Sequence, residues 1–135
     1  MKKAFLALAI FGLLLSCKNE TTANSVITEV KLVPVEDVLN IVQMEEAQLI
    51  DVRTPEEYGE GHIANALNID FFSDNFLENM ENLDKEKPVV LYCKSGNRSN
   101  KSAQKLKESG FSKIYDVDGG ITEWKNKGFD VQMMP

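Results

Sequence analysis

The sequence contains few of the histidine and cysteine side chains that bind zinc, and fewer basic than acidic ones. It has one histidine and two cysteines, which are fewer ligands than the usual zinc sites need, so we expect neither a metal nor another cofactor. The 15 Lys and Arg residues are outnumbered by 21 Asp and Glu, for a formal net charge of −6. Because nucleic-acid binding needs a basic surface, we also exclude nucleic acid as a partner.

Long hydrophobic runs are absent except for one near the N-terminus. Residues 4–15 are apolar apart from Gly12 and follow Lys2 and Lys3 directly. This run is shorter than the roughly 20 apolar residues of a transmembrane helix, and it matches the charged start and apolar centre of a secretory signal. We therefore expect an exported protein whose remaining residues do not cross a membrane.

The residues that end this run, Leu14-Leu15-Ser16-Cys17, resemble the bacterial lipobox. The resemblance implies a lipoprotein signal peptide at residues 1–16 and lipid on Cys17, whereas an ordinary secretory signal with a chance cysteine is the alternative. Each buried CH₂ of an acyl chain adds about 0.8 kcal/mol of membrane affinity. We thus expect a lipid-anchored protein of the bacterial cell envelope, on its periplasmic side. An internal disulfide is then excluded, and Cys93 is a free thiol.

Downstream of the signal, the pattern predicts a tether and one domain. Residues 17–30 are polar without an apolar period, as in a flexible tether, and the domain spans residues 31–135. Short apolar runs alternate there with segments of helical spacing, which predicts an α/β fold with a mainly parallel sheet and helices on both faces. Strands are expected at 32–33, 48–52, 66–69, 89–92 and 113–117, and helices at 35–42, from 55 to about 60, and at 75–83, 99–109 and 120–127.

The spacing also predicts a helix start and two buried helix faces. Thr54 is expected to cap a helix whose first residue is Pro55. The residues expected on the buried faces are Val35, Val38, Leu39 and Val42 in the first helix, and Phe76, Leu77, Met80 and Leu83 in the third.

Cys93 directly follows the most apolar predicted strand, at the sheet edge where open α/β sheets bind ligands. Its polar loop, residues 93–98, leads into a helix N-terminus, where free N–H groups and the helix dipole favour negative charge. Lys94 and Arg98 add two cations, and Gly96 lets the loop curl so that N–H groups converge on an anion. These features predict a reactive thiolate rather than an inert buried cysteine.

Three stretches resemble signatures of the rhodanese family, sulfurtransferases that carry sulfane sulfur as a cysteine persulfide. The active-site loop matches Cys93-Lys94-Ser95-Gly96-Asn97-Arg98-Ser99. The other two matches are Asp51 to Tyr58 with Gly61-His62-Ile63, and Asp118-Gly119-Gly120-Ile121 with Trp124 and Gly128. The three occur in the right order across about residues 31–134, which makes the resemblance specific.

The resemblance implies a role for each matching residue. Cys93 is the expected catalytic nucleophile, and the expected substrate-binding residues are Lys94, Ser95, Gly96, Asn97 and Arg98. For Arg98, contact with the donor and pairing with a carboxylate both remain open. Asp51, Arg53 and Ser99 are expected to support the loop, with Glu57 in the same ion-pair network. His62 is expected to form structural hydrogen bonds, and Trp124 to lie in the core or beside the site.

The same resemblance implies partners. These are a small anionic sulfur donor such as thiosulfate, and a thiol, cyanide or protein acceptor. Separately, we expect the lipid anchor to bind the membrane and the chain to be a monomer. Two other functions compete. Rhodanese-like phosphatases have five residues between the cysteine and the arginine, and this chain has four; they also place a histidine where Tyr92 stands. Non-catalytic rhodanese modules commonly lack the cysteine that is present here.

Overall fold

The most apolar run of the sequence forms the centre of the sheet in the computed structural model, which describes residues 28–135. All four residues of strand β4 (Val89–Tyr92) are fully buried, as expected for a strand covered on both faces. The predicted signal peptide, Cys17 and nearly all of the predicted tether lie outside the described residues. In the described part of the chain, no helix is long and apolar enough to cross a membrane.

The sheet has five strands in the order β1-β5-β4-β2-β3. Strands β1 (Glu29–Val33), β2 (Gln48–Asp51), β3 (Leu67–Asn68) and β5 (Lys113–Val117) join β4, and every neighbouring pair is parallel. Because parallel neighbours need crossover connections, the helices lie between the strands in sequence and cover the sheet. The predicted α/β fold is confirmed.

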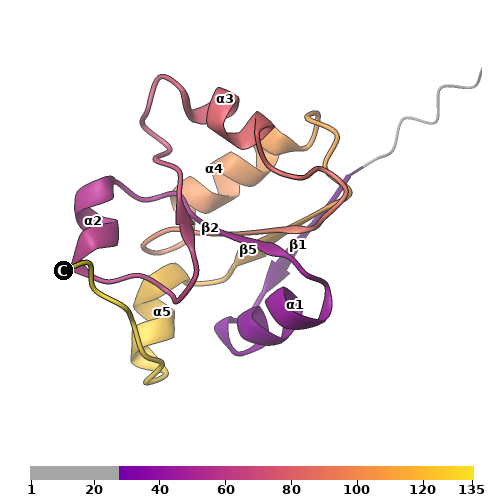
Figure 1. Cartoon of the computed structure of the whole chain (residues 1–135). Coiled ribbons are helices and arrows are strands. Elements are labelled where there is room, and N and C mark those ends of the chain that lie inside the picture. The colour runs from indigo at the N-terminus through magenta and orange to yellow at the C-terminus, as the bar shows by residue number, and fades with distance from the viewer. Residues whose placement is uncertain (1–27) are drawn as a thin grey trace, which may run out of the picture.

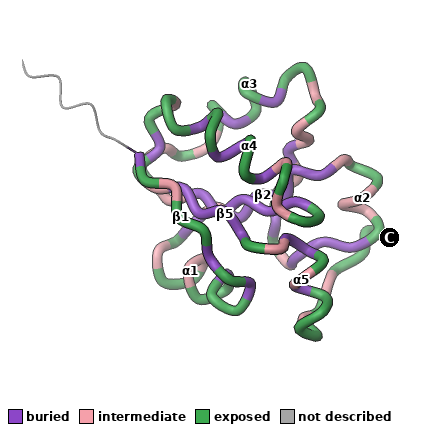
Figure 2. Tube along the Cα trace, turned by 180° about the vertical axis from the view of Figure 1, so that it is seen from behind, coloured by how far each residue is buried: buried purple, intermediate pink, exposed green. Residues whose placement is uncertain are grey.

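The helices form a layer on each face of the sheet (Figure 1). Helices α1 (Val38–Met44) and α5 (Gly120–Asn126) cover one face, and α3 (Phe76–Glu81) and α4 (Asn97–Leu106) cover the other. The short helix α2 (Pro55–Glu60) lies near the C-terminal ends of the strands, and a 3₁₀ turn (Val35–Asp37) precedes α1. In Figure 2 the middle of the sheet is mostly buried, with exposed segments outside it.

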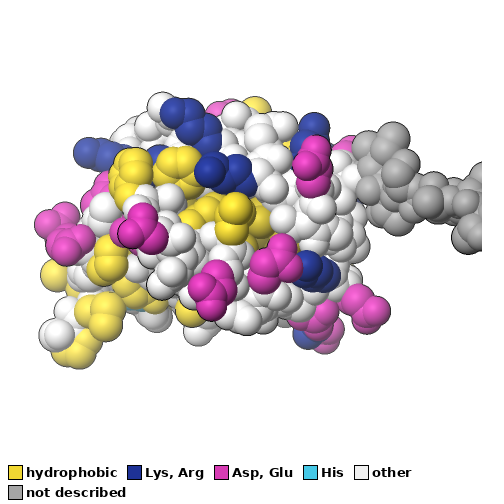
Figure 3. All heavy atoms as spheres, turned by 90° about the horizontal axis from the view of Figure 1, so that it is seen from above, with side chains coloured by type: hydrophobic (Ala, Val, Ile, Leu, Met, Phe, Trp, Pro, Cys, Tyr) yellow, Lys and Arg dark blue, Asp and Glu magenta, His cyan; other side chains and the backbone are white. Residues whose placement is uncertain are grey.

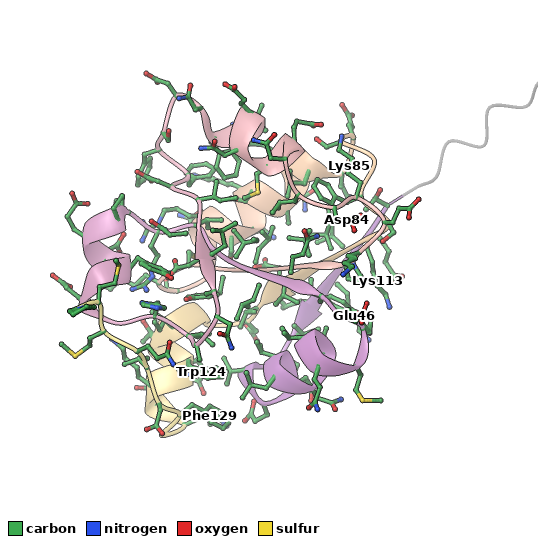
Figure 4. All side chains as sticks on the ribbon, viewed as in Figure 1. Glu46, Asp84, Lys85, Lys113, Trp124 and Phe129 are labelled. Carbon is green, nitrogen blue, oxygen red and sulfur yellow. The ribbon has the colours of Figure 1, made fainter. Side chains whose placement is uncertain are left out.

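Alternate residues of the strands fill two separate cores. Val90 and Tyr92 pack with Trp124 on the α1/α5 side, whereas Leu91 and Ile114 pack on the α3/α4 side. Burying a side chain of this size contributes roughly 1.5–3 kcal/mol. Trp124 lies in the core, which is one of the two placements expected for it. Its ring packs against that of Phe129 at a tilt of 39°, and its Nε1–H donates to Asp130 O at 2.9 Å (Figure 4).

Helix α2 begins with the predicted cap. Glu57 N–H donates to Thr54 Oγ1 (3.3 Å) and Thr54 N–H donates to Glu57 Oε2 (3.0 Å), which is a reciprocal capping box, and Pro55 is the first helical residue. This cap fixes the direction in which the Glu57 carboxylate leaves the helix.

Most predicted element bounds differ from the structure by one to three residues, and two of these differences have a clear physical cause. Strand β1 begins at Glu29, so Glu29 and Val30, which the sequence analysis placed in the tether, pair with β5. This edge strand is largely exposed and therefore lacks the apolar alternation that would reveal it. Helix α4 begins at Asn97 rather than Ser99. Its first turn is polar because it faces the site and solvent, so it lacks the apolar spacing that predicts a helix.

Two leucines predicted to be buried are exposed. Leu39 is 51% exposed and Leu77 is 48% exposed. Each directly follows a fully or largely buried residue, Val38 or Phe76, from which it is turned by about 100° around a helix that packs on one side only. In α1 the position expected for Leu39 is taken by Ile41, which packs against the core.

Candidate active site

Cys93 lies at the C-terminal end of β4, where the chain leaves the sheet. Its side chain is buried, and Gly96 N–H donates to its Sγ at 3.1 Å. Gly96 has φ +113°, a conformation that favours glycine, and it is the N-cap residue of α4. The chain therefore turns within three residues of the cysteine and directs the start of a helix toward the sulfur.

The first turn of α4 supplies further donors. The N–H groups of Asn97, Arg98 and Ser99 have no acceptor within their own helix, as at any helix N-terminus, and the helix dipole is positive there. Gly96 N–H contacts the sulfur directly, and the helix N-terminus that follows it favours a negatively charged atom there. Lys94, Ser95 and Asn97 are exposed.

Helix α5 holds the loop from the other side. Ile121 N–H donates to Cys93 O (2.9 Å), and Thr122 N–H donates to Lys94 O (3.0 Å). These contacts require Gly120 between the two backbones, because a Cβ at that position would lie 2.4 Å from Cys93 O. Gly120 of the C-terminal signature is therefore a packing requirement of the Cys93 loop.

Arg98 pairs with a carboxylate. Its Nη1 and Nη2 donate to the two oxygens of Glu57 at 2.6 and 2.8 Å, a bidentate pair that joins α4 to α2. The hydrogen bond from Arg98 lowers the pKa of Glu57 to about 2. Arg98 also lies over the ring of Phe72, which is 66% exposed. Hydrophobic and basic side chains are adjacent on this α3/α4 side of the molecule (Figure 3).

Asp51 and Arg53 form a buried ion pair at 2.6 Å, next to the site rather than in the loop. The second contact of the guanidinium is Gly61 O at 2.7 Å, and Asn68 Nδ2 bridges Asp51 O and Arg53 O. Arg53 also lies over the ring of Tyr92, the residue before Cys93. The pair thus fixes the segment between β2 and β3 and reaches the loop only through β4.

Ser99 connects the loop to β5 through a residue that the sequence analysis did not select. Its Oγ donates to Asp116 Oδ1 at 2.6 Å and accepts from Cys93 Sγ at 3.6 Å. The sequence predicts Asp116 only as part of the strand at 113–117. Its acidic side chain in an otherwise buried strand indicates that it needs a specific partner.

His62 lies in a backbone network away from the cysteine. Its Nδ1 is 2.9 Å from Tyr58 O, its ring stacks on Tyr58, and its backbone pairs with Gln132. These are structural contacts of the kind expected. Among residues 28–135, His, Cys, Asp and Glu side chains form no cluster of three that could hold a metal ion.

At the opposite end of the sheet lie charged residues that take no part in the site. Figure 4 labels Glu46, Asp84, Lys85 and Lys113 at the end where the parallel strands begin. Cys93 and its loop lie at the other end of the sheet, where the strands end, and so do the residues that contact this loop.

Comparison with known proteins identifies the family. Residues 34–127 match the rhodanese-like domain family, and the chain belongs to it. Thiosulfate sulfurtransferase GlpE of Coxiella burnetii is 41% identical over 85 residues, which cover 63% of this chain and 78% of GlpE. Uncharacterized protein YqhL of Bacillus subtilis is 41% identical over 81 residues, which cover 60% of this chain and 63% of YqhL.

A solved structure shows the same fold. The rhodanese-related protein of Thermoplasma volcanium has a TM-score of 0.68 and 28% identity, covering 77% of this chain and 99% of that one. The family and the fold implied by the three sequence signatures are thus confirmed.

Proposed function

We propose that the protein is a sulfurtransferase that moves sulfane sulfur from thiosulfate or a similar anionic donor to a nucleophilic acceptor through a persulfide on Cys93. The observation that best supports this is the placement of the Cys93 sulfur, which receives Gly96 N–H at 3.1 Å and faces the first turn of α4. The name of the Coxiella burnetii relative, thiosulfate sulfurtransferase, supports the same donor.

In the first half-reaction the Cys93 thiolate attacks the outer sulfur of the donor. A bond forms between Sγ and that sulfur, the S–S bond of thiosulfate breaks, and sulfite leaves with the electron pair. The exposed ammonium of Lys94 attracts the donor's negative charge. The N–H groups of Gly96 and the α4 first turn then stabilise the negative persulfide.

In the second half-reaction a nucleophile such as cyanide or a thiol attacks the outer sulfur of the persulfide. The Sγ–S bond breaks, the acceptor keeps the transferred sulfur, and Cys93 returns as a thiolate. The donors that held the persulfide now stabilise the charge on Sγ. Arg98, which Glu57 holds at 2.6 Å, fixes the shape of the loop in both steps.

Loop length argues against the phosphatase alternative. Four residues separate Cys93 from Arg98, one fewer than in rhodanese-like phosphatases, and the shorter loop suits one sulfur atom better than a tetrahedral phosphate. A non-catalytic binding role is disfavoured because Cys93 is present and its sulfur is already hydrogen-bonded by the loop. We also propose that the protein is lipid-anchored through Cys17 in the cell envelope, since the lipobox-like residues support export.

The test is mass spectrometry of the purified protein after incubation with thiosulfate. We expect one added sulfur atom on the Cys93 peptide, released by cyanide. Cys93→Ser should fold and add none, because a serine hydroxyl without a nearby base is a poor nucleophile. Cys17→Ala, which removes the other cysteine, should add sulfur as the wild type does.

Kinetics separate the two reaction classes. At one salt concentration, kcat/KM for thiosulfate with cyanide should greatly exceed that for an aryl phosphate. A preference for the aryl phosphate, or sulfur transfer by Cys93→Ser, would overturn the proposal.

A further inference from the structure

A buried acid beside the site takes no part in the sulfur transfer described above. Asp116 of β5 is 2% exposed, and its neighbours in register are Leu32 of β1 and Leu91 of β4. Ser99 Oγ donates to one carboxylate oxygen (2.6 Å) and Asn100 Nδ2 to the other (3.4 Å). Both donors are neutral, so hydrogen bonds rather than a positive charge compensate the carboxylate.

Ser99 connects this acid to the reactive sulfur. Its Oγ lies 3.6 Å from Cys93 Sγ, 2.6 Å from Asp116 Oδ1 and 3.2 Å from Gly96 O. A serine hydroxyl has one proton and donates to one acceptor at a time. The shortest contact is in the range of about 2.5–2.7 Å that is typical of a hydroxyl donating to a carboxylate. An ionised Asp116 therefore holds the Ser99 proton and leaves Oγ lone pairs facing Sγ.

Building on the proposed sulfur transfer, we propose that Asp116 is a positioning residue that controls, through Ser99, the charge on the Cys93 sulfur. With Asp116 ionised, Ser99 accepts a hydrogen bond from Cys93 S–H, and the thiol form is favoured. With Asp116 protonated, its O–H donates to Ser99 Oγ, and the Ser99 hydroxyl is free to donate to the thiolate.

The proton balance closes within the three side chains. The S–H bond of Cys93 breaks and its proton goes to Ser99 Oγ, while the Ser99 proton goes to Asp116 Oδ1. The product is a thiolate that accepts from Ser99, beside a neutral acid. This is also the arrangement that favours the second half-reaction, because Sγ regains its negative charge when the acceptor takes the outer sulfur.

The surroundings favour proton uptake by Asp116. Burial raises its pKa and the charge of Asp118 acts in the same direction, while the hydrogen bonds from Ser99 and Asn100 oppose them. The leucines paired with it on β1 and β4 carry no charge. Apart from Cys93, the ionisable group that acts on it is thus Asp118, an exposed residue beyond the end of β5.

The experiment measures the alkylation of Cys93 by iodoacetamide as a function of pH. Peptide mass spectrometry reads the Cys93 peptide, so the full chain can be used. Asp116→Asn should lower the midpoint of the profile by about one pH unit, and so speed alkylation about tenfold below the wild-type midpoint, because a neutral amide removes the competing anion. Asp118→Asn removes a nearby exposed acid that does not contact Ser99, and its shift should be much smaller.

A second variant tests the role of Ser99 as the link. In a Ser99→Ala background, the further change Asp116→Asn should shift the midpoint by less than half as much as it does alone, since the hydroxyl no longer connects the two groups. A merely structural role for Asp116 would alter the melting temperature but would not give this pattern of midpoints.

The reciprocal measurement needs no substitution and remains available if Asp116→Asn does not fold. Blocking Cys93 with methyl methanethiosulfonate removes the sulfur charge, so the NMR midpoint of the Asp116 carboxyl should fall. An unchanged Asp116 midpoint, or an unchanged or higher alkylation midpoint in folded Asp116→Asn, would overturn the link. Alkylation uses no sulfur donor. Absence of persulfide together with a shifted midpoint would therefore refute the sulfur transfer and leave the link intact.

Discussion

Gly120→Ala is the sharpest test of how the loop is held. Gly120 has φ +57°, and a Cβ there would lie 2.4 Å from Cys93 O and 2.7 Å from Lys94 O. Real Cβ atoms essentially never approach closer than 3.0 Å, so Cys93 O must retreat by at least 0.6 Å. The same shift stretches the bonds that Ile121 and Thr122 N–H donate to the two loop carbonyls.

The expected loss of stability follows from two contributions. A non-glycine residue in the left-handed region costs about 1–2 kcal/mol, and weakening two backbone hydrogen bonds costs about 1 kcal/mol each. The free energy of unfolding should thus fall by about 3–4 kcal/mol, which for a domain of this size lowers Tm by roughly 10 °C or more. Because the displaced atoms belong to the nucleophile's own residue, sulfur transfer should fall at least about tenfold.

Two other glycines separate these contributions. Gly128 has φ +81° with open space around a Cβ, so Gly128→Ala should cost about 1 kcal/mol and leave sulfur transfer unchanged. Gly59 also has open space, in α2, and Gly59→Ala should be neutral or stabilising by up to about 1 kcal/mol. Calorimetry and thiosulfate assays would measure all three. If Gly120→Ala has the same Tm as Gly128→Ala and transfers sulfur as fast as the wild type, the steric argument is wrong.

Two further predictions concern the Arg98 pair and the N-terminus. The pKa of Glu57 is about 2 in the folded protein against 4.5 for the free side chain, so its stabilisation is full above about pH 4.5 and is lost as pH falls toward 2. After discounting for partial exposure, Glu57→Gln should lower the free energy of unfolding by about 1–2 kcal/mol at pH 7, measured by urea denaturation. An equally large difference between variant and wild type at pH 2 would contradict this. Cys17→Ala should release the protein from the membrane fraction or leave an unprocessed precursor. Failure of the wild type to incorporate labelled palmitate would refute the lipid anchor.

The alternation of strands and helices was predictable because burial determines it. Val89–Tyr92 is a continuous apolar run, and a strand of that kind must lie at the centre of a parallel sheet with helices on both faces. The place of the site follows from the same fact, because the residue after such a strand emerges at the edge where ligands bind. Cys93 can therefore be proposed as the nucleophile without knowing any tertiary contact.

The partners of the loop were less accessible to sequence reasoning. The sequence predicts Glu57 in one ion-pair network with Asp51 and Arg53, whereas Glu57 pairs with Arg98, 41 positions away. Asp116 stands out in the sequence only as an acid inside an apolar strand, and its partners Ser99 and Asn100 lie on another element. Such pairings depend on which strands are adjacent, and local periodicity does not contain that information.

The sheet order explains why one loop depends on three distant segments. β4 lies between β2 and β5, so the residues that follow or end those strands reach the Cys93 loop from both sides. The Glu57 carboxylate on Arg98 comes from α2, which follows β2. The Asp116 carboxylate on Ser99 comes from β5, and the N–H groups of Ile121 and Thr122 come from α5, which follows β5. These supports act on different atoms, so their loss should have different effects. Loss of the α5 contacts displaces the nucleophile, loss of Glu57 loosens the loop in a manner that depends on acid pH, and loss of Asp116 changes the charge on the sulfur at fixed geometry. Comparing Tm with the alkylation midpoint across these variants therefore distinguishes a loop that is merely held in place from one whose thiolate is also controlled.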